Sequence, residues 1–286
     1  MKLLITGGSG FLGRRTAAYF HTLGCQVLTL SHRELDITDG IAVRGWFREH
    51  RPEAVIHTAA ISDTGLCQQK PVWSERINVD GCLNLAESCR DFGAKLVLCS
   101  SDQVYSGSTV SGPHWEDEAL TPNNVYGCQK LLAEQRCLKI LPETVCLRLS
   151  WMYSTEHFPG EHGHFLSTLK AALEDETKPL TWPIYDRRGL TDVETVVNHL
   201  PAALNLPGGV WNFGAENHAS TYETVKDLLT QLHMTAALAR LQPNAAAFAD
   251  NNRDISMDLT KLHAAGITFP ATLDGLIRAM KKEEIL

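Results

Sequence analysis

Tyr126 and Lys130, four residues apart, are the side chains of this chain best suited to proton transfer. The surrounding pattern predicts a helix at Val125–Ile140, and a spacing of four places both side chains on one helical face. Because an ammonium beside a phenol favours the phenolate, we expect Lys130 to lower the pKa of Tyr126. Such a pair exchanges a proton with a carbonyl or alcohol oxygen. The same spacing is common on solvated helix faces, so the rest of the sequence must decide between the two interpretations.

Ser101 and Asp102 supply a hydroxyl and a carboxylate where the apolar run Lys95–Ser100 ends. Ligands of open parallel sheets bind beyond the carboxyl ends of the strands. Ser101 is therefore placed to hold a reacting oxygen while Tyr126 protonates it. Asp102, the next residue, is a candidate for the substrate side of the site.

A glycine-rich turn follows the first apolar run, Lys2–Thr6, and precedes a helical pattern. Gly7 permits a tight turn, Gly10 lets the backbone approach a pyrophosphate, and Gly13 lets the helix pack closely on the sheet. A helix N-terminus also offers N–H groups and the positive end of its dipole to phosphates. This strand–turn–helix context predicts a dinucleotide site. Its candidate contacts are Gly7, Gly10, Phe11, Leu12 and Gly13.

The end of the second predicted strand, Gln26–Leu30, bears on which dinucleotide binds. A strand-end acid typically holds the ribose hydroxyls of NAD. Here the strand is followed by Ser31, His32 and Arg33, with no acid at its tip. A hydroxyl and a guanidinium suit a 2′-phosphate. We therefore favour NADP(H), with NAD(H) as the alternative.

Alternating strand and helix patterns fill the first half of the chain. Such alternation predicts a Rossmann-type, doubly wound parallel sheet of the α/β class. We expect strands at Lys2–Thr6, Gln26–Leu30, Ala54–Thr58, Lys95–Ser100 and Thr144–Leu149, and helices at Gly10–Leu23, Asp39–His50, Trp73–Phe92 and Val125–Ile140.

The second half is less regular and predicts a smaller α/β lobe. We expect a cofactor domain at 1–150, joined again by segments near 189–214, and a substrate lobe mainly at 151–286. The predicted helices are Gly163–Glu174, Asp192–Leu204, Thr221–Leu232, Leu259–Ala265 and Thr272–Lys281, with a strand at Val210–Phe213 and a loop at Leu241–Arg253.

Charge and composition indicate which classes of binding partner are disfavoured and in which cellular compartment the protein is expected. The formal net charge is −7, which disfavours nucleic acid and anionic membranes as partners. No apolar run is long enough to span a bilayer, and the chain shows no signal peptide. The eight cysteines form no paired motif, so we expect free thiols in a reducing cytoplasm. The twelve histidines form no metal-binding pattern, and no metal is expected.

Together these segments resemble the extended short-chain dehydrogenases/reductases over nearly the whole chain. Within that group the chain is similar to the nucleotide-sugar 4-ketoreductases typified by dTDP-4-dehydrorhamnose reductase. The glycine turn and the Tyr–Lys pair are general to the superfamily. Segments more particular to the reductases are Leu35–Asp39 and Ser150-Trp151; further supporting segments are Thr58–Ala60, Asn78–Gly81, Ser100–Gly107, Asn124–Lys130 and Ser256–Leu262.

The resemblance implies a role for each matching residue. Tyr126 would protonate the sugar oxygen, Lys130 would lower its pKa and hold the nicotinamide ribose, and Ser101 would bond the same oxygen. The hydride would come from the cofactor. The cofactor would also contact Asp36, Ile37, Ala59, Ala60 and Asn78, while the nucleotide-sugar substrate would contact Asp102, Trp151 and Arg188.

Other reactions and roles stay open as alternatives. The related dehydratases carry an Asp-Glu pair where this chain has Asp102-Gln103, and an amide cannot serve as their base. An epimerase usually carries the strand-end acid. A non-catalytic NADP-binding regulatory subunit, like the β subunit of methionine adenosyltransferase, remains an alternative, as does a homodimer through the helices near 73–92 and 125–140. Residues 61–67 and 188–191 depart from the family pattern where substrate binds, so the sugar stays open.

Overall fold

The chain folds into two compact units. The computed structural model describes residues 1–158, 161, 163–250 and 252–282. The first unit comprises Met1–Val104, Leu120–Arg148 and Val197–Trp211, and the second comprises Tyr105–Ala119, Leu149–Val196 and the described residues from Asn212 onward. The chain thus returns to the first unit after residue 196. Which unit serves the cofactor and which the substrate remains a prediction.

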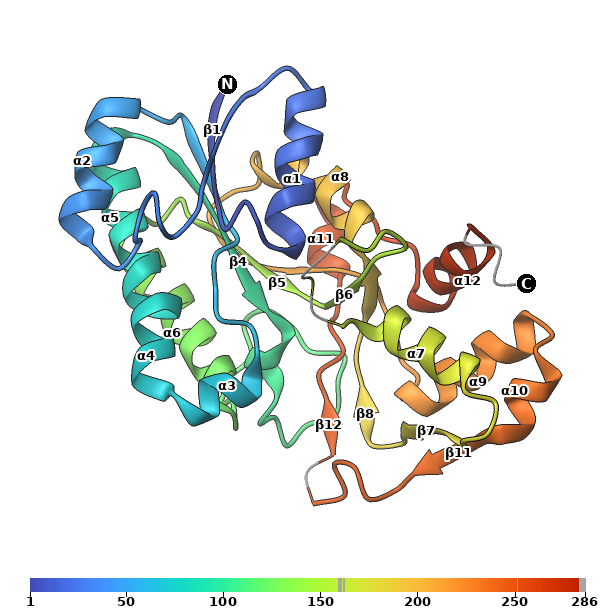
Figure 1. The fold of residues 1–286 in the computed structure, drawn as a ribbon. Coiled ribbons are helices and arrows are strands. Elements are labelled where there is room, and N and C mark those ends of the chain that lie inside the picture. The colour runs from blue at the N-terminus through green and yellow to red at the C-terminus, as the bar shows by residue number, and fades with distance from the viewer. Residues whose placement is uncertain (159–160, 162, 251, 283–286) are drawn as a thin grey trace. The chain divides into compact units, whose positions relative to one another are not determined.

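A six-stranded sheet with the order β10-β5-β4-β3-β1-β2 forms the centre of the first unit (Figure 1). The pairs β1–β2, β1–β3 and β3–β4 are parallel. The strand order reverses at β1, and such switch points bind ligands in doubly wound sheets. The predicted α/β class is confirmed. The strands are β1 (Lys2–Thr6), β2 (Gln26–Leu30), β3 (Ala54–His57), β4 (Lys95–Ser101), β5 (Val145–Leu149) and β10 (Gly209–Phe213).

The helices that connect these strands agree with the predicted positions, with two differences. The predicted helix at Trp73–Phe92 begins at Pro71 and contains a π-helical turn at Arg76–Asp80. The short helix α3, capped by the Asp63 carboxylate, was not predicted because six residues show no clear period. The helices are α1 (Phe11–Thr22), α2 (Gly40–His50), α3 (Thr64–Gln69), α4 (Pro71–Glu75), α5 (Gly81–Phe92) and α6 (Val125–Ile140), with a 3₁₀ turn at Asp102–Tyr105.

Helices α2, α5 and α6 lie side by side against one face of the sheet (Figure 1). Each presents apolar residues at helical spacing, such as Val43 and Phe47, which are fully buried. Four cysteines, Cys82, Cys89, Cys137 and Cys146, belong to this core. All eight cysteines are free thiols. These four act as small apolar side chains of the core.

The second unit contains three short parallel strand pairs, β6–β9, β7–β11 and β8–β12. The loop predicted at Leu241–Arg253 is partly wrong, because β11 and the first residue of β12 lie within it. Both strands form by pairing with distant strands, which local sequence does not reveal. The elements are β6 (Trp151–Tyr153), α7 (Phe165–Glu174), β7 (Leu180–Pro183), β8 (Asp186–Arg187), β9 (Leu190–Asp192), α8 (Val193–Ala203, which continues into the first unit), α9 (Thr221–Gln231), α10 (Thr235–Arg240), β11 (Leu241–Asn244), β12 (Arg253–Asp254), α11 (Thr260–Ala264) and α12 (Thr272–Lys282). Within the described ranges, no helix is long and apolar enough to cross a membrane.

A buried ion pair joins α6 to the sheet. The Arg148 guanidinium on β5 donates from Nη2 to Glu134 Oε2 at 2.8 Å and from Nε to Oε1 at 3.1 Å. Ser100 on β4 also donates to Glu134. Both charged side chains are at least 97% buried. The pair therefore fixes the helix that carries Tyr126 and Lys130 against two strands.

Removing one member of this pair should leave an uncompensated buried charge. We expect Arg148→Met to lower the free energy of unfolding by about 3–5 kcal/mol, measured by urea denaturation. The double variant Glu134→Leu/Arg148→Met should be more stable than that single variant, because it buries no lone charge. A double variant with the summed losses of both single variants would contradict this account.

Candidate active site

Ser101, Tyr126 and Lys130 come together in the first unit, at the carboxyl end of β4. The Ser101 hydroxyl lies close enough to Tyr126 to lower the pKa of its phenol, and it donates to the Asp102 carboxylate at 3.1 Å. The Lys130 ammonium lies 5.7 Å from the centre of the Tyr126 ring and donates to the Cys99 carbonyl at 2.8 Å. All three residues are at least 92% buried. The sequence prediction that these groups would converge is thus matched by the geometry.

Burial, and not Lys130, decides the ionisation of Tyr126. Burial makes the largest contribution and raises the pKa of the phenol. Lys130 and the Ser101 hydroxyl lower this pKa, and Asp102 raises it, so that the net pKa is raised. The predicted net lowering of this pKa is therefore wrong, although the Lys130 contribution has the expected sign. Tyr126 stays protonated at neutral pH, which is the form that can give a proton away.

Lys130 keeps its charge in spite of burial. Burial lowers the pKa of its ammonium, but Tyr126, followed by Cys82, Cys99 and Glu134, raises it, and the net pKa is raised. The ammonium thus remains a fixed positive charge beside the phenol. Such a charge stabilises the phenolate that forms when Tyr126 loses its proton.

The first turn of α6 is held where Tyr126 needs it. The Asn124 carboxamide caps the helix by accepting from the Gly127 N–H at 2.8 Å. A Cβ at Gly127 would lie 2.4 Å from the Gln103 carbonyl oxygen, so only glycine allows this approach. The capping residue and the glycine together bring Tyr126 next to Ser101.

The glycine turn has the shape that a dinucleotide requires. Gly7 has φ +69, and the Gly10 N–H donates to its carbonyl at 2.9 Å. A Cβ at Gly13 would lie 2.2 Å from that same oxygen. No described side chain caps α1 at Gly10, and the helix N-terminus, with Phe11 and Leu12, starts at the turn. The turn therefore fits a pyrophosphate at the N-terminus of a 12-residue helix.

An acid that the sequence analysis did not consider, Glu34, lies four residues beyond the end of β2. One oxygen of the Glu34 carboxylate accepts from both the backbone N–H and the hydroxyl of Ser31, each at 2.8 Å. These bonds lower the pKa of Glu34, so it is anionic at neutral pH. Arg33 beside it is exposed. The spacing Ser31-x-x-Glu34 is that of a capping box, a signal that would have revealed this contact.

Four further candidate cofactor residues follow β2 and β3. Asp36 is exposed and accepts from the backbone and hydroxyl of Thr38, which lowers the pKa of its carboxyl. Ile37 is half-buried, and its carbonyl accepts from Asn84 at 2.8 Å. Ala59 and Ala60 are half-buried, and a Cβ on Gly7 would touch the Ala59 backbone. Contacts of these four with a cofactor remain a prediction.

Asn78, the fifth of these candidates, lies in the interior and bonds the protein backbone. Its side chain is completely buried. It accepts from the Ile61 N–H at 2.8 Å and donates to the Ile61 carbonyl at 3.0 Å. Asn78 thereby fixes the backbone next to Ala60. Any part that it has in cofactor binding acts through this loop.

The remaining substrate candidates lie in separate units. Asp102 is buried in the first unit and accepts from the Ser101 hydroxyl at 3.1 Å. In the second unit, the Arg188 guanidinium stacks over Trp151, 5.0 Å from the ring centre. Phe165 packs edge-on against the same indole. Trp151 and Arg188 thus form one aromatic–cation cluster in which Arg188 is buried, and contact of either residue with a substrate remains a prediction.

Comparisons with known proteins identify the family of the chain. The RmlD substrate binding domain family matches residues 1–284. A dTDP-4-dehydrorhamnose reductase of Streptomyces griseus is 30% identical over 281 residues, which cover 93% of this chain and 88% of that protein. The β subunit of methionine adenosyltransferase 2 from Xenopus tropicalis is 33% identical over 53% of this chain and 47% of its own length.

A solved structure shares the fold. It is the Bacillus anthracis dTDP-4-dehydrorhamnose reductase in complex with NADP, with a TM-score of 0.84 at 22% identity over 99% of both chains. At that identity the likeness concerns the fold. The family match over almost the whole sequence and the Streptomyces relative go further, and they show that this chain belongs to the RmlD substrate binding domain family.

Proposed function

We propose that this protein is an NADPH-dependent reductase of a nucleotide-linked 4-keto-6-deoxy sugar. The observation that carries the proposal is the buried cluster of Ser101, protonated Tyr126 and charged Lys130 at the end of β4. A protonated phenol beside a fixed ammonium is the arrangement needed to complete reduction of a ketone. The family membership supports the same reaction.

The chain's own groups handle the proton. The Ser101 hydroxyl and the Tyr126 phenol hydrogen-bond the carbonyl oxygen of the sugar and orient it. Tyr126 gives its proton to that oxygen as the ketone becomes an alcohol. Lys130 stabilises the resulting phenolate until a proton returns from solvent. When bound, NADPH supplies the hydride to the carbonyl carbon and leaves as NADP⁺.

The glycine turn and the end of β2 would hold the cofactor. The N-terminus of α1 and the tight approach at Gly13 fit the pyrophosphate. Ser31 and Arg33 would contact the 2′-phosphate once the Glu34 carboxylate turns away from Ser31. The B. anthracis relative was solved with NADP, which supports this choice of cofactor.

The relatives' names support a deoxythymidine diphosphate sugar as substrate. They include reductases of dTDP-4-dehydrorhamnose and of dTDP-4-keto-6-deoxy-D-glucose. In the first unit, Asp102, which lies beside Ser101, would contact the sugar; Trp151 and Arg188 of the second unit are separate candidates for substrate contact. We place the enzyme in the cytoplasm, where eight free thiols and a soluble sugar nucleotide are both expected.

A regulatory role is the second candidate, favoured by the partial match to a methionine adenosyltransferase β subunit. That role needs cofactor binding and no turnover. Purified protein mixed with NADPH and dTDP-4-keto-6-deoxyglucose separates the two. Loss of NADPH absorbance that depends on the sugar supports the reductase, and tight NADPH binding without any oxidation supports the regulator.

Replacing Tyr126 by Phe should abolish the proton donor and keep the fold. We expect turnover to fall by at least about 100-fold, since general acid catalysis contributes 10²–10⁴-fold. NADPH binding, followed by its fluorescence, should change little. Tyr19→Phe on α1 is the matched control and should turn over like the unchanged protein. Comparable turnover by Tyr126→Phe would exclude Tyr126 as the acid.

The raised pKa of Tyr126 sets the pH profile of reduction. The phenol must be protonated to act, so activity should be lost only as pH rises through its pKa, which lies above the ordinary tyrosine value of 10.0. With NADPH saturating, kcat/KM for the keto sugar should therefore stay level from neutral pH to the ordinary tyrosine range. An alkaline limb that begins near neutrality would show that the acid is a different group or that the phenol is not buried as described.

Arg33 and Glu34 should set the choice between NADPH and NADH in opposite directions. Arg33→Ala should weaken NADPH binding about tenfold by loss of a charge-assisted phosphate contact, with little effect on NADH. Glu34→Gln should strengthen NADPH binding, because an anion beside the 2′-phosphate is removed. Titrations of cofactor fluorescence measure both, with Arg48→Ala as an exposed arginine control. Equal effects on the two cofactors would place the 2′-phosphate elsewhere.

A further inference from the structure

We propose that Gln129 is a positioning residue that sets the distance between the catalytic helix α6 and the loop that follows β3. The inference rests on the proposed reductase function and names a residue that the predicted site did not include. Gln129 lies between Tyr126 and Lys130 in the sequence, yet its side chain points to a different side of the helix. It faces the segment Pro71–Asp80 and not the presumed substrate.

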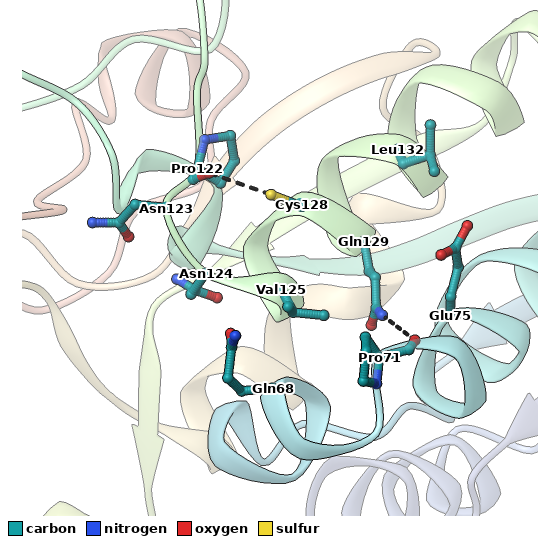
Figure 2. Close-up of a pocket in the computed structure, with 10 residues that line it drawn as sticks. All are labelled: Gln68, Pro71, Glu75, Pro122, Asn123, Asn124, Val125, Cys128, Gln129 and Leu132. Atoms are coloured by element: carbon teal, nitrogen blue, oxygen red, sulfur yellow. Dashed lines mark hydrogen bonds between the residues drawn. The ribbon is translucent and has the colours of Figure 1, made fainter.

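The Gln129 carboxamide forms hydrogen bonds through both its nitrogen and its oxygen. Its Nε2 donates to the Ser74 hydroxyl at 2.9 Å and to the Pro71 carbonyl at 3.0 Å. Its Oε1 accepts from the Asn78 carboxamide at 2.9 Å. Figure 2 shows the amide reaching from α6 to Pro71 along the wall of a surface pocket. Gln129 is 96% buried, and Ser74 and Asn78 are completely buried.

Asn78 extends the connection to the loop after β3. The same carboxamide that donates to Gln129 also holds the N–H and the carbonyl of Ile61. Cys67 donates to that carbonyl as well, at 3.3 Å. Two buried side chains thus join α6 to the backbone beside Ala59 and Ala60. Asn78 also lies in the π-helical turn Arg76–Asp80, a local irregularity of a kind frequent at functional sites.

Only an amide of this length satisfies the arrangement. The position needs one acceptor for Asn78 and two donor hydrogens for Ser74 and Pro71. A glutamine provides these, whereas a leucine of similar size provides neither. Without the amide, Asn78 loses one of its partners, and α6 is no longer tied to the loop. The proton donor and the cofactor would then shift relative to each other.

Gln129→Leu tests this connection on the full-length protein. We expect kcat to fall about 10- to 100-fold, because a displacement of about 1 Å costs this much in alignment. The KM for the sugar should change little. The isotope effect with NADPH deuterated at C4 should increase as hydride transfer becomes slower. Gln135→Leu, an exposed glutamine on the same helix, is the matched control.

A second variant, Gln129→Glu, distinguishes positioning from stability alone. While protonated, the introduced carboxyl can accept from Asn78 and donate to Ser74. This variant should therefore be most active at acidic pH and lose activity as the carboxyl ionises. Gln129→Leu should be slow at every pH. If both variants keep the isotope effect and the pH profile of the unchanged protein, Gln129 has no positioning role.

A readout that does not depend on turnover separates this inference from the proposed function. Exchange of the Ile61 amide hydrogen, which Asn78 holds, should accelerate in Gln129→Leu and stay unchanged in Gln135→Leu. Faster exchange in a protein that oxidises no NADPH would support the connection and refute the reductase. Normal exchange in an active reductase would overturn the connection and leave the function standing.

Discussion

The buried ammonium of Lys130 is the constraint on which the candidate site depends. A buried charge must find partners or lose its proton; the Lys130 ammonium donates to the Cys99 carbonyl and lies 5.7 Å from the centre of the Tyr126 ring. The other titratable groups nearby are mostly neutral. Burial, followed by Lys130 itself, lowers the pKa of His57 to about 3, and burial raises the pKa of Cys82 to about 11. Lys130 therefore dominates the local electrostatics and requires α6 to pack closely on β4.

Three separate connections hold α6 in its position. The Glu134–Arg148 pair ties the middle of α6 to β5, the absence of a side chain at Gly127 lets its first turn approach Gln103, and the Gln129 carboxamide ties it to Asn78. The first is a desolvated ion pair, the second is a close backbone approach that only glycine permits, and the third is a network of neutral hydrogen bonds. The side chains of Tyr126 and Lys130 are thus oriented by residues that never contact the reacting atoms.

The sequence was sufficient to predict what local chemistry encodes. The glycine turn, the strand and helix alternation and the Tyr126–Lys130 spacing could all be recognised from it, because each is a short-range pattern with a strong physical cause. The features that the sequence did not predict depend on residues far apart in the chain. The raised pKa of Tyr126 depends on burial by the whole unit, and β11 and β12 form only against distant strands. Asn78, one of the three partners of Gln129, is 51 residues away. Glu34 is the exception, since its capping-box spacing was visible.

The most direct test of the account follows the transferred hydrogen. The protein is incubated with dTDP-4-keto-6-deoxyglucose and NADPH that carries deuterium at both C4 positions, and the sugar product is examined by mass spectrometry and NMR. The account predicts one deuterium per product molecule, located on carbon 4 of the sugar, with an alcohol in place of the ketone. A bound cofactor that keeps all its deuterium while the sugar stays unreduced would contradict the reductase and leave a cofactor-binding protein without this chemistry.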